Sequence, residues 1–210
     1  MLKLICFDLD NVLVDTKDLH FQALQYACKY VAGFDLTKDY HNEYLEALPT
    51  KTKISILNNH NLVDKLYNDE IYKEKQRATE LLFAKHVKPD QKIEDILVYC
   101  RNNFRYVHLA SNCIRSSVDI LLKRLEIADL FDFTIANTEI ELPKPHPEMY
   151  MKCILQAKVV PIQTLIVEDS LNGKLAAILS GAHVLETDIN SISIKQIEDK
   201  VKLINMLRQY

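Results

Sequence analysis

The chain begins with the stretch Leu2-Lys3-Leu4-Ile5-Cys6-Phe7, which runs directly into Asp8-Leu9-Asp10. A nearly continuous apolar run of this length is typical of a strand that is buried on both faces in the middle of a parallel sheet. In an open α/β sheet, ligands bind beyond the carboxyl ends of the strands. We therefore expect a central strand here, with two carboxylates at the end where chemistry takes place.

The rest of the chain divides into two regions with different secondary-structure patterns. From about Thr16 to His86 we find only helix patterns, including the stretches 52–59 and 69–86. After Lys88-Pro89, helix patterns alternate with short apolar strands near 106–110, 133–136, 165–167 and 182–185. Strands alternating with helices indicate βαβ units and a parallel sheet. The predicted fold is α/β: a Rossmann-like parallel sheet core over 1–15 and 88–210, with a small α-helical cap inserted at 16–87.

Local signals place several helix ends. Asp90 is a suitable N-cap for a helix that carries Ile93, Ile96, Leu97 and Cys100 on one face. A later helix is predicted over Gly173 to Ser180 and stops at Gly181, a favourable residue just after a helix.

Composition excludes several classes of protein. The 210 residues are 48% apolar and 26% charged with a net charge of −3, which are ordinary values for a soluble globular protein and exclude disorder and coiled coil. The 26 basic and 29 acidic residues leave no basic footprint for nucleic acid, and no apolar run is long enough to span a membrane. Five scattered cysteines suit reduced thiols. We expect a cytoplasmic protein, a monomer or weak homo-oligomer, with no nucleic-acid or membrane partner.

Polar residues follow each of the first four predicted strands. They are Asp8 and Asp10, then Ser111-Asn112, then Lys144 in a proline-rich loop, then Glu168-Asp169. The chain has only three glycines, and neither of the two standard glycine-rich phosphate-binding motifs occurs in it. Carboxylates suit a hard divalent cation, and a lysine with a hydroxyl suits a phosphoryl group. Each residue also has a structural interpretation, as a turn cap, a helix N-cap or a solvated loop lysine.

These motifs resemble those of a known family in order and spacing. Phe7-Asp8-Leu9-Asp10-Asn11-Val12-Leu13-Val14-Asp15-Thr16 is similar to the first motif of the haloacid dehalogenase-like hydrolase superfamily. Ser111-Asn112 resembles the second motif, Lys144 in Lys-Pro-His-Pro-Glu-Met-Tyr the third, and Val167-Glu168-Asp169-Ser170 with Gly173 the fourth. The helical insert resembles the cap of the β-phosphoglucomutase-like and phosphoglycolate phosphatase-like branch.

The resemblance implies a mechanism. Asp8 would be the nucleophile that forms an aspartyl-phosphate, and Asp10 the general acid and then the base. Lys144 would neutralise the transferring group, while Ser111 and Asn112 would donate hydrogen bonds to the phosphate.

The same resemblance implies a cofactor, Mg²⁺. Asp8, the backbone carbonyl of Asp10 and the pair Glu168-Asp169 would bind it, with Asp169 as a direct ligand.

The predicted cap matches the family less closely. Thr16 and His20 match its hinge-side segment, and Lys51, with Lys53 and Lys75, is a candidate to meet an anionic substrate. The stretch Leu45 to Lys51 lacks the glycine found in many substrate loops of this branch, and Glu46 stands where the mutases tend to have lysine.

A second departure lies in the first motif. Asn11 replaces the usual glycine, and asparagine tolerates a positive φ.

The leading interpretation is a Mg²⁺-dependent phosphatase acting on a small phosphorylated metabolite such as a sugar phosphate. The alternatives are a β-phosphoglucomutase-type phosphomutase and a non-catalytic phosphate-binding module. A halide-displacing dehalogenase fits poorly because Asp10 and the acidic pair are present. A phosphonate hydrolase fits poorly because position 10 is acidic.

Overall fold

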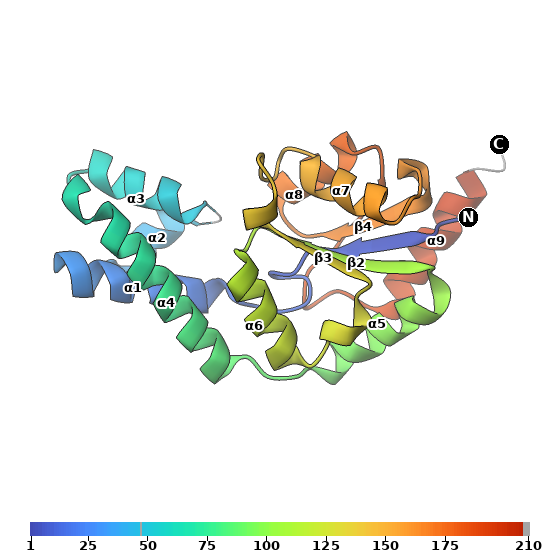
Figure 1. Cartoon of the computed structure of the whole chain (residues 1–210), viewed down its shortest axis with the longest axis horizontal. Coiled ribbons are helices and arrows are strands. Elements are labelled where there is room, and N and C mark those ends of the chain that lie inside the picture. Colours follow the sequence, from blue (N-terminus) through green and yellow to red (C-terminus); the bar gives the residue numbers. More distant parts are fainter. Residues whose placement is uncertain (47, 208–210) are drawn as a thin grey trace. The chain divides into compact units, whose positions relative to one another are not determined.

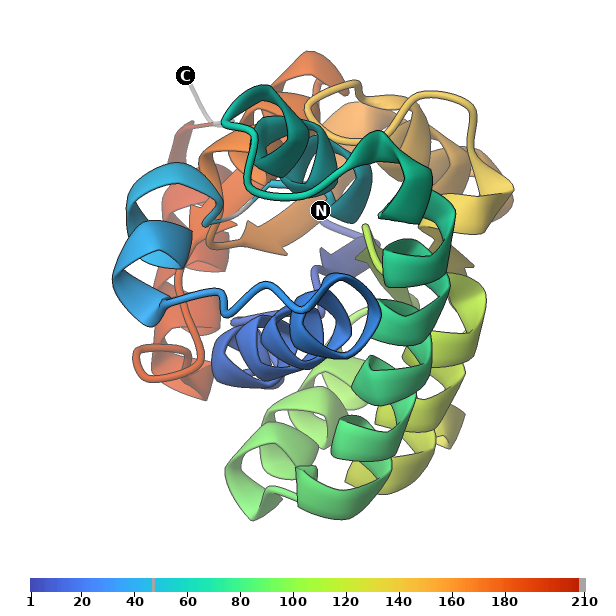
Figure 2. The ribbon, with the colours of Figure 1, turned by 90° about the vertical axis from the view of Figure 1, so that its left-hand side faces the viewer.

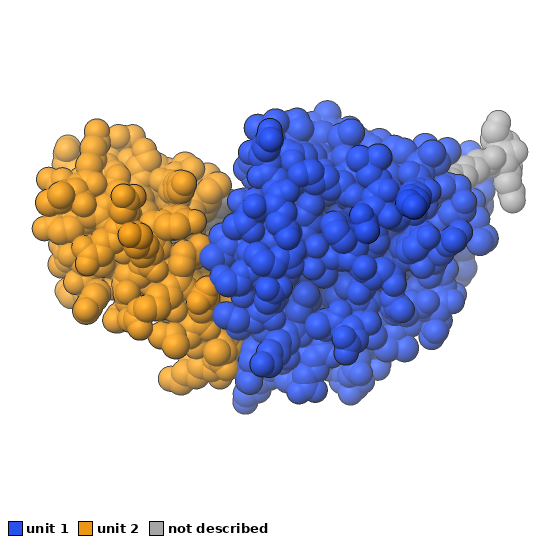
Figure 3. Space-filling view, in the orientation of Figure 1, with its two compact units in different colours: residues 1–15, 87–210 blue, residues 16–86 orange. Residues whose placement is uncertain are grey.

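The computed structural model describes residues 1–46 and 48–207. The chain divides into two compact units, one made of Met1–Asp15 with Val87–Tyr210 and the other of Thr16–His86, coloured separately in Figure 3. The described part of the first unit contains the sheet, and the second unit is helical. We call them the sheet unit and the helical unit.

The sheet unit is built on five parallel strands, in the order β3-β2-β1-β4-β5. These are β1 (Leu4–Phe7), β2 (Tyr106–Ser111), β3 (Phe133–Ala136), β4 (Thr164–Glu168) and β5 (His183–Glu186). Every residue of β1 is buried, as its continuous apolarity predicts. Phe7 pairs with Leu109 and with Val167, so β1, β2 and β4 end at the same edge. The predicted α/β, Rossmann-like parallel sheet is confirmed.

Helices cover both faces of this sheet (Figure 1). On one side lie α7 (Glu148–Gln156) and α8 (Leu171–Leu179), and on the other lie α5 (Gln91–Asn103) and α6 (Arg115–Leu125). The last helix is α9 (Ile194–Leu207). Three short 3₁₀ turns complete the unit: η2 (Ala128–Leu130), η3 (Asn137–Glu139) and η4 (Pro161–Gln163).

The helical unit has a hydrophobic core of its own, which contains Phe21, Leu24, Leu36, Leu57 and Ile71. Its helices are α1 (Lys17–Ala32), α2 (Lys38–Tyr44), α3 (Thr50–Asn59) and α4 (Asn68–His86), with the 3₁₀ turn η1 (Lys65–Tyr67). Helix α1 packs along α4, and both can be followed in Figure 2, α1 in blue and α4 in green.

Local capping explains where the observed ends agree with and differ from the sequence prediction. The Asp90 carboxylate accepts from the Lys92 amide, and Gly181 has a φ of 78° after α8, as predicted. Helix α8 begins at Leu171 rather than at Gly173, because the Ser170 hydroxyl accepts from the Gly173 amide and makes Ser170 the N-cap. The prediction had passed over Ser170 as a cap.

Candidate active site

The loop after β1 carries the first pair of predicted residues. The Asp8 amide donates to the Val167 carbonyl at 3.0 Å, which extends the pairing with β4 by one residue. Asn11 has a φ of 61° and its amide donates to the Val14 carbonyl at 2.6 Å, closing a tight turn. The asparagine therefore adopts the positive φ that the sequence predicted it could tolerate.

Lys144 lies at the centre of the site and is 6% exposed. Its Nζ donates to Asp8 Oδ1 at 2.5 Å, to Glu168 Oε1 at 2.7 Å and to the Ala110 carbonyl at 3.0 Å. The proline-rich loop after β3 thus directs its lysine to the ends of β1, β2 and β4. The interpretation of Lys144 as a solvated loop lysine does not fit this burial.

Glu168, at the end of β4, is fully buried and accepts hydrogen bonds at both oxygens. Oε1 accepts from Lys144, and Oε2 accepts from the amides of Asp169 and Ser170 and from the Ser170 hydroxyl. Gly173 leaves the space for this carboxylate, since a Cβ there would lie 1.7 Å from Glu168 Oε1. Glu168 therefore anchors Lys144 and the start of α8 at once.

Tyr150 is a further member of the site that the sequence interpretation did not assign a role. It is fully buried on α7, donates its hydroxyl hydrogen to Glu168 Oε1 at 2.8 Å, and lies with its ring centroid 4.7 Å from Lys144 Nζ. A buried tyrosine hydroxyl needs a partner, which was the available signal, but the sequence alone did not show which residue would accept.

Opposite charges stabilise one another in this network. Burial disfavours charge on Lys144, yet the carboxylates of Asp8 and Glu168 hold its pKa above the ordinary value. Burial likewise opposes the ionised form of Glu168, yet Lys144 holds the pKa of that carboxyl below its usual range. Burial raises the pKa of Asp8, Lys144 counters it, and the neighbouring charges of Glu168 and Asp10 add to the rise. The site therefore favours a further positive charge next to Asp8.

The donor set beside Asp8 fits a divalent cation. One ligand oxygen each from Asp8, Glu168 and Asp169 lies within 4.8 Å of the others. Asn11 Nδ2 donates to Asp169 Oδ2 at 2.7 Å and so orients that carboxylate. Lys144 pairs with two of these carboxylates, Asp8 and Glu168. Asp169 adds a third, so the cluster carries more negative than positive charge, and carboxylate oxygens in such a cluster are the ligands that Mg²⁺ prefers. Which of the three binds a metal directly stays a prediction.

The end of β2 brings Ser111 and Cys113 beside the first loop. Ser111 is fully buried, and its Oγ accepts from the Cys113 amide at 3.0 Å. Cys113 Sγ in turn donates to Asp10 Oδ2 at 3.0 Å. Asn112 is exposed. The sequence analysis counted Cys113 only among the scattered reduced thiols, and nothing in the pattern linked it to Asp10, 103 residues away.

The helical unit holds the remaining predicted residues. Thr16 is buried just before α1, and His20 Nδ1 lies 3.2 Å from Lys75 Nζ. Lys51 is exposed and lies with its Nζ 5.7 Å from the centroid of the Tyr72 ring. The stretch from Leu45 to Lys51 includes Ala47, which lies outside the described residues.

Two lysines of this unit are buried, in contrast to Lys51. Lys53 and Lys75 are 9% and 7% exposed, and Lys53 Nζ lies 3.0 Å from His41 Nε2. Burial, together with the charge of Lys75, lowers the pKa of Lys53 to about 8. This cluster of basic side chains is the strongest concentration of buried positive charge among the described residues of the helical unit.

Comparison with known proteins is in accord with this geometry. The family model for haloacid dehalogenase-like hydrolases matches residues 5–186. The chain belongs to this family. It is 26% identical over 192 residues to a phosphorylated carbohydrates phosphatase of Thermotoga maritima, covering 90% of this chain and 86% of the relative. It is 27% identical over 178 residues to the β-phosphoglucomutase of Bacillus subtilis, covering 82% and 77%.

Solved structures show the same fold. A crystal structure of CbbY from Rhodobacter sphaeroides in complex with phosphate superposes with a TM-score of 0.78 at 24% identity, covering 90% of this chain and 87% of that one. A β-phosphoglucomutase from Clostridium difficile has the same TM-score at 22% identity, covering 98% of this chain and 100% of that one.

Among the described residues, 1–46 and 48–207, no helix is both long and apolar enough to cross a membrane.

Proposed function

We propose that this hydrolase is a Mg²⁺-dependent phosphatase of a small phosphomonoester, such as a sugar phosphate. The observation that carries the proposal is the buried network in which Lys144 contacts both Asp8 and Glu168 at the shared edge of the strands. A carboxylate nucleophile, a fixed ammonium and a set of oxygen ligands for a metal are groups that phosphoryl transfer requires. The relatives named as phosphatases support the same reaction.

In the first step, an oxygen of Asp8 attacks the phosphorus. The new bond joins Asp8 to the phosphoryl group, the bond to the leaving alcohol breaks, and Asp10 gives its proton to the leaving oxygen. In the second step, water attacks the aspartyl-phosphate and gives a proton to Asp10. Inorganic phosphate leaves and Asp8 is restored. Lys144 balances the charge of Asp8 and of the transferring group throughout, and Ser111 and Asn112 would donate hydrogen bonds to the phosphate.

Asp8, Asp169 and the backbone carbonyl of Asp10 would hold Mg²⁺. Glu168 would support them, since its two oxygens already accept five hydrogen bonds from Lys144, Tyr150, Asp169 and Ser170. When bound, the metal screens the negative charges of the nucleophile and the phosphate from one another.

The helical unit would act as a cap that supplies positive charge to the substrate. Lys53 and Lys75, with His20 beside Lys75, are its candidates for binding an anionic group. Lys51 and Thr16 stay weaker candidates, Lys51 because it is exposed and lies over Tyr72. A small phosphorylated metabolite in the cytoplasm is the expected partner.

A β-phosphoglucomutase-type phosphomutase is the second candidate, favoured by the relative of that name. It requires an aspartyl-phosphate that transfers its phosphoryl group to a sugar before water attacks. Glu46, in place of the lysine that the mutases tend to have, disfavours it.

The test is phosphate release from a panel of small phosphomonoesters, with and without Mg²⁺, for the wild type and Asp8→Asn. We expect metal-dependent release by the wild type and a loss of at least about 1,000-fold in Asp8→Asn, because the amide is not a nucleophile. Circular dichroism confirms that the variant is folded. Turnover by folded Asp8→Asn would refute the mechanism, and isomerised sugar phosphate without free phosphate would establish the mutase.

A further inference from the structure

The outer surface of α7 and α8 is unusually apolar. The exposed residues of α8 are Leu171, Asn172, Leu175, Ile178 and Leu179, and those of α7 are Met151, Leu155 and Gln156. None of them is charged, and the charged side chains that these helices leave partly exposed are those of Glu148, Lys152 and Lys174, which are 18%, 42% and 22% exposed. On the opposite side of the sheet, α5 exposes Lys92, Glu94, Asp95 and Arg101, as a solvated helix does.

This surface continues beyond the two helices. Val160 and Ile162, which follow α7, are 53% and 59% exposed. We call the following residues the α7–α8 face: Met151, Leu155, Val160, Ile162, Leu171, Leu175, Ile178 and Leu179. The exposed fractions of these side chains range from 41% to 71%. Together they present on the order of 800 Å² of apolar side chain, more than the ~300–600 Å² patch of a typical monomer.

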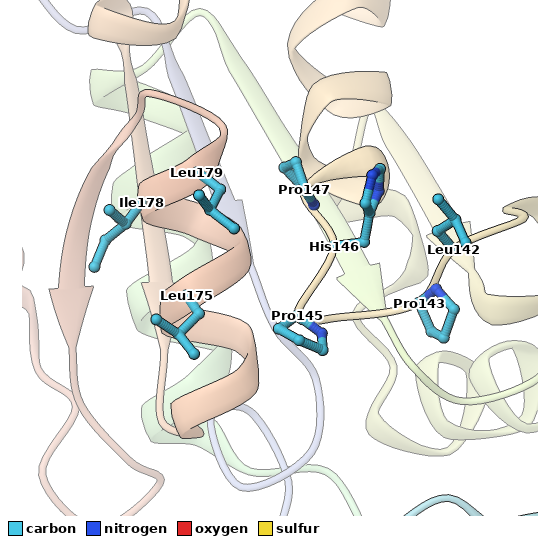
Figure 4. Close-up of a pocket in the computed structure, with 8 residues that line it drawn as sticks. All are labelled: Leu142, Pro143, Pro145, His146, Pro147, Leu175, Ile178 and Leu179. Carbon is cyan, nitrogen blue, oxygen red and sulfur yellow. The ribbon is translucent and has the colours of Figure 1, made fainter.

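A groove of about 500 Å³ lies within this surface, between α8 and the proline-rich loop. Figure 4 shows its two walls, one formed by Leu175, Ile178 and Leu179 of α8 and the other by the loop before α7. The loop side consists of Leu142, Pro143, Pro145, His146 and Pro147. The surface thus offers both protruding apolar side chains and a hollow that side chains of the same kind can fill.

The charges beside the face show what can cover it. Lys152 pairs with Glu148 at 2.8 Å, and Lys174 pairs with Glu186. Lys158, between Leu155 and Val160 in the chain, and Glu141, which precedes the proline-rich loop, are exposed as well, so three basic and three acidic residues border the face. An anionic membrane or an acidic partner would call for an excess of basic residues here. A surface without net charge can instead meet a copy of itself without repulsion.

We propose that the α7–α8 face is a homodimer interface, on which a second copy of this chain docks with the same residues. In such a two-fold contact a patch must be complementary to itself, and protruding residues beside a groove satisfy that condition. The exposed apolar area is about the ~800 Å² that each partner contributes to a standard protein–protein interface. The proposal does not depend on the function proposed above, since it uses none of the catalytic residues.

The test is sedimentation equilibrium of the full chain over a wide range of concentrations. We expect the wild type to have twice the mass of the chain. In Leu175→Glu/Leu179→Glu, four carboxylates would enter one dimer interface. We expect the dissociation constant of the dimer to rise at least about 100-fold. The matched control is Leu203→Glu/Leu207→Glu on α9, with the same spacing and with 49% and 69% exposure, which should dimerise like the wild type.

Hydrogen exchange of the wild type gives a second readout that needs no variant to fold. Raising the protein concentration should slow exchange in peptides from α7 and α8 and leave α9 unchanged. A wild type that stays monomeric would overturn the proposal. A dimer that the Leu175→Glu/Leu179→Glu substitutions weaken no more than the control substitutions do would also overturn it, because the interface would then lie elsewhere.

Discussion

The Asp10 carboxylate accepts a hydrogen bond from a thiol. Cys113 Sγ lies 3.0 Å from Asp10 Oδ2, and the Cys113 amide donates to the Ser111 hydroxyl oxygen. Cys113 therefore restrains both Asp10, the proposed general acid and base, and Ser111, whose hydroxyl is proposed to bind phosphate. A thiol is a weak donor, but a hydrogen bond to a carboxylate restricts where that carboxylate can turn.

Replacing Cys113 tests this positioning role. In Cys113→Ala, the loss of a donor to an ionised group should lower kcat roughly tenfold, and the limb of the pH–rate profile that reports Asp10 should move to higher pH. Cys113→Ser keeps a donor and should restore most of the rate and the profile. Initial rates between pH 5 and 9 provide the measurement. A Cys113→Ala profile that coincides with that of the wild type would assign Cys113 to packing alone.

At the scale of single residues, the sequence indicated the residues that follow the strands and missed those that reach them from elsewhere. Asp8, Ser111 and Glu168 come directly from strand ends, so the βαβ pattern suffices to bring them to one edge. Cys113 and Tyr150 contact the site only because of how the loop after β2 turns and which way α7 faces. Those orientations depend on tertiary packing, which a single sequence does not reveal.

The start of α8 shows how one element supports the site. Ser170 caps the helix and donates to Glu168, while Gly173 lies in the first turn where the Glu168 carboxylate needs room. A side chain at position 173 would meet that carboxylate at less than the distance of any non-bonded contact. The first turn of α8, its N-cap Ser170 and the Glu168 carboxylate therefore fix one another's positions.

Gly173→Ala should therefore displace Glu168 and, with it, Lys144. We expect kcat to fall about 100-fold, because a shift of about 1 Å in a catalytic group has that effect. Steady-state kinetics and thermal unfolding give the readout. Gly33→Ala is the matched control: Gly33 has a φ of 67° with no heavy atom within 4 Å of the added Cβ. It should cost about 1–2 kcal/mol of stability and leave kcat unchanged. Equal kinetics in the two variants would contradict the role of Gly173.

At the scale of elements, periodicity and capping predicted the five strands and the alternation of helices correctly, while the ends shifted by one or two residues. The helix with an evident side-chain cap, α5 after Asp90, begins where the sequence placed it. Helix α3 begins at Thr50, two residues before the predicted start. Its N-cap is Pro49, which offers no side-chain hydrogen bond as a signal.

At the scale of the whole molecule, buried lysines have different partners in the two units. In the sheet unit, the buried Lys144 contacts two carboxylates. In the helical unit, the buried Lys53 lies beside His41. Burial and the positive charge of Lys75 both disfavour the charged form of Lys53. Burying a charge without full compensation lowers stability, so we expect Lys53 to serve the anion binding proposed above rather than the fold.

The pH dependence of stability tests this interpretation of Lys53. Its pKa is about 8 in the folded protein against an ordinary 10.5. Below pH 8 it is charged in both the folded and the unfolded state, and the destabilisation is complete. Between pH 8 and 10.5 the unfolded chain binds more protons, so stability rises with pH in that window.

Lys53→Met removes the buried charge, so at pH 7 the variant should be more stable than the wild type by about 1–3 kcal/mol. That advantage should shrink as the pH rises from 8 to 10.5, which denaturant unfolding at a series of pH values would measure. Lys51→Met, two residues earlier on the same helix, removes an exposed lysine and should leave the pH dependence as it is. Inorganic phosphate should stabilise the wild type more than Lys53→Met, because an anion bound at the cluster offsets the charge that the variant lacks. Equal stabilisation by phosphate would exclude Lys53 from anion binding, and a constant stability difference across the pH range would show that its charge does not act on the fold.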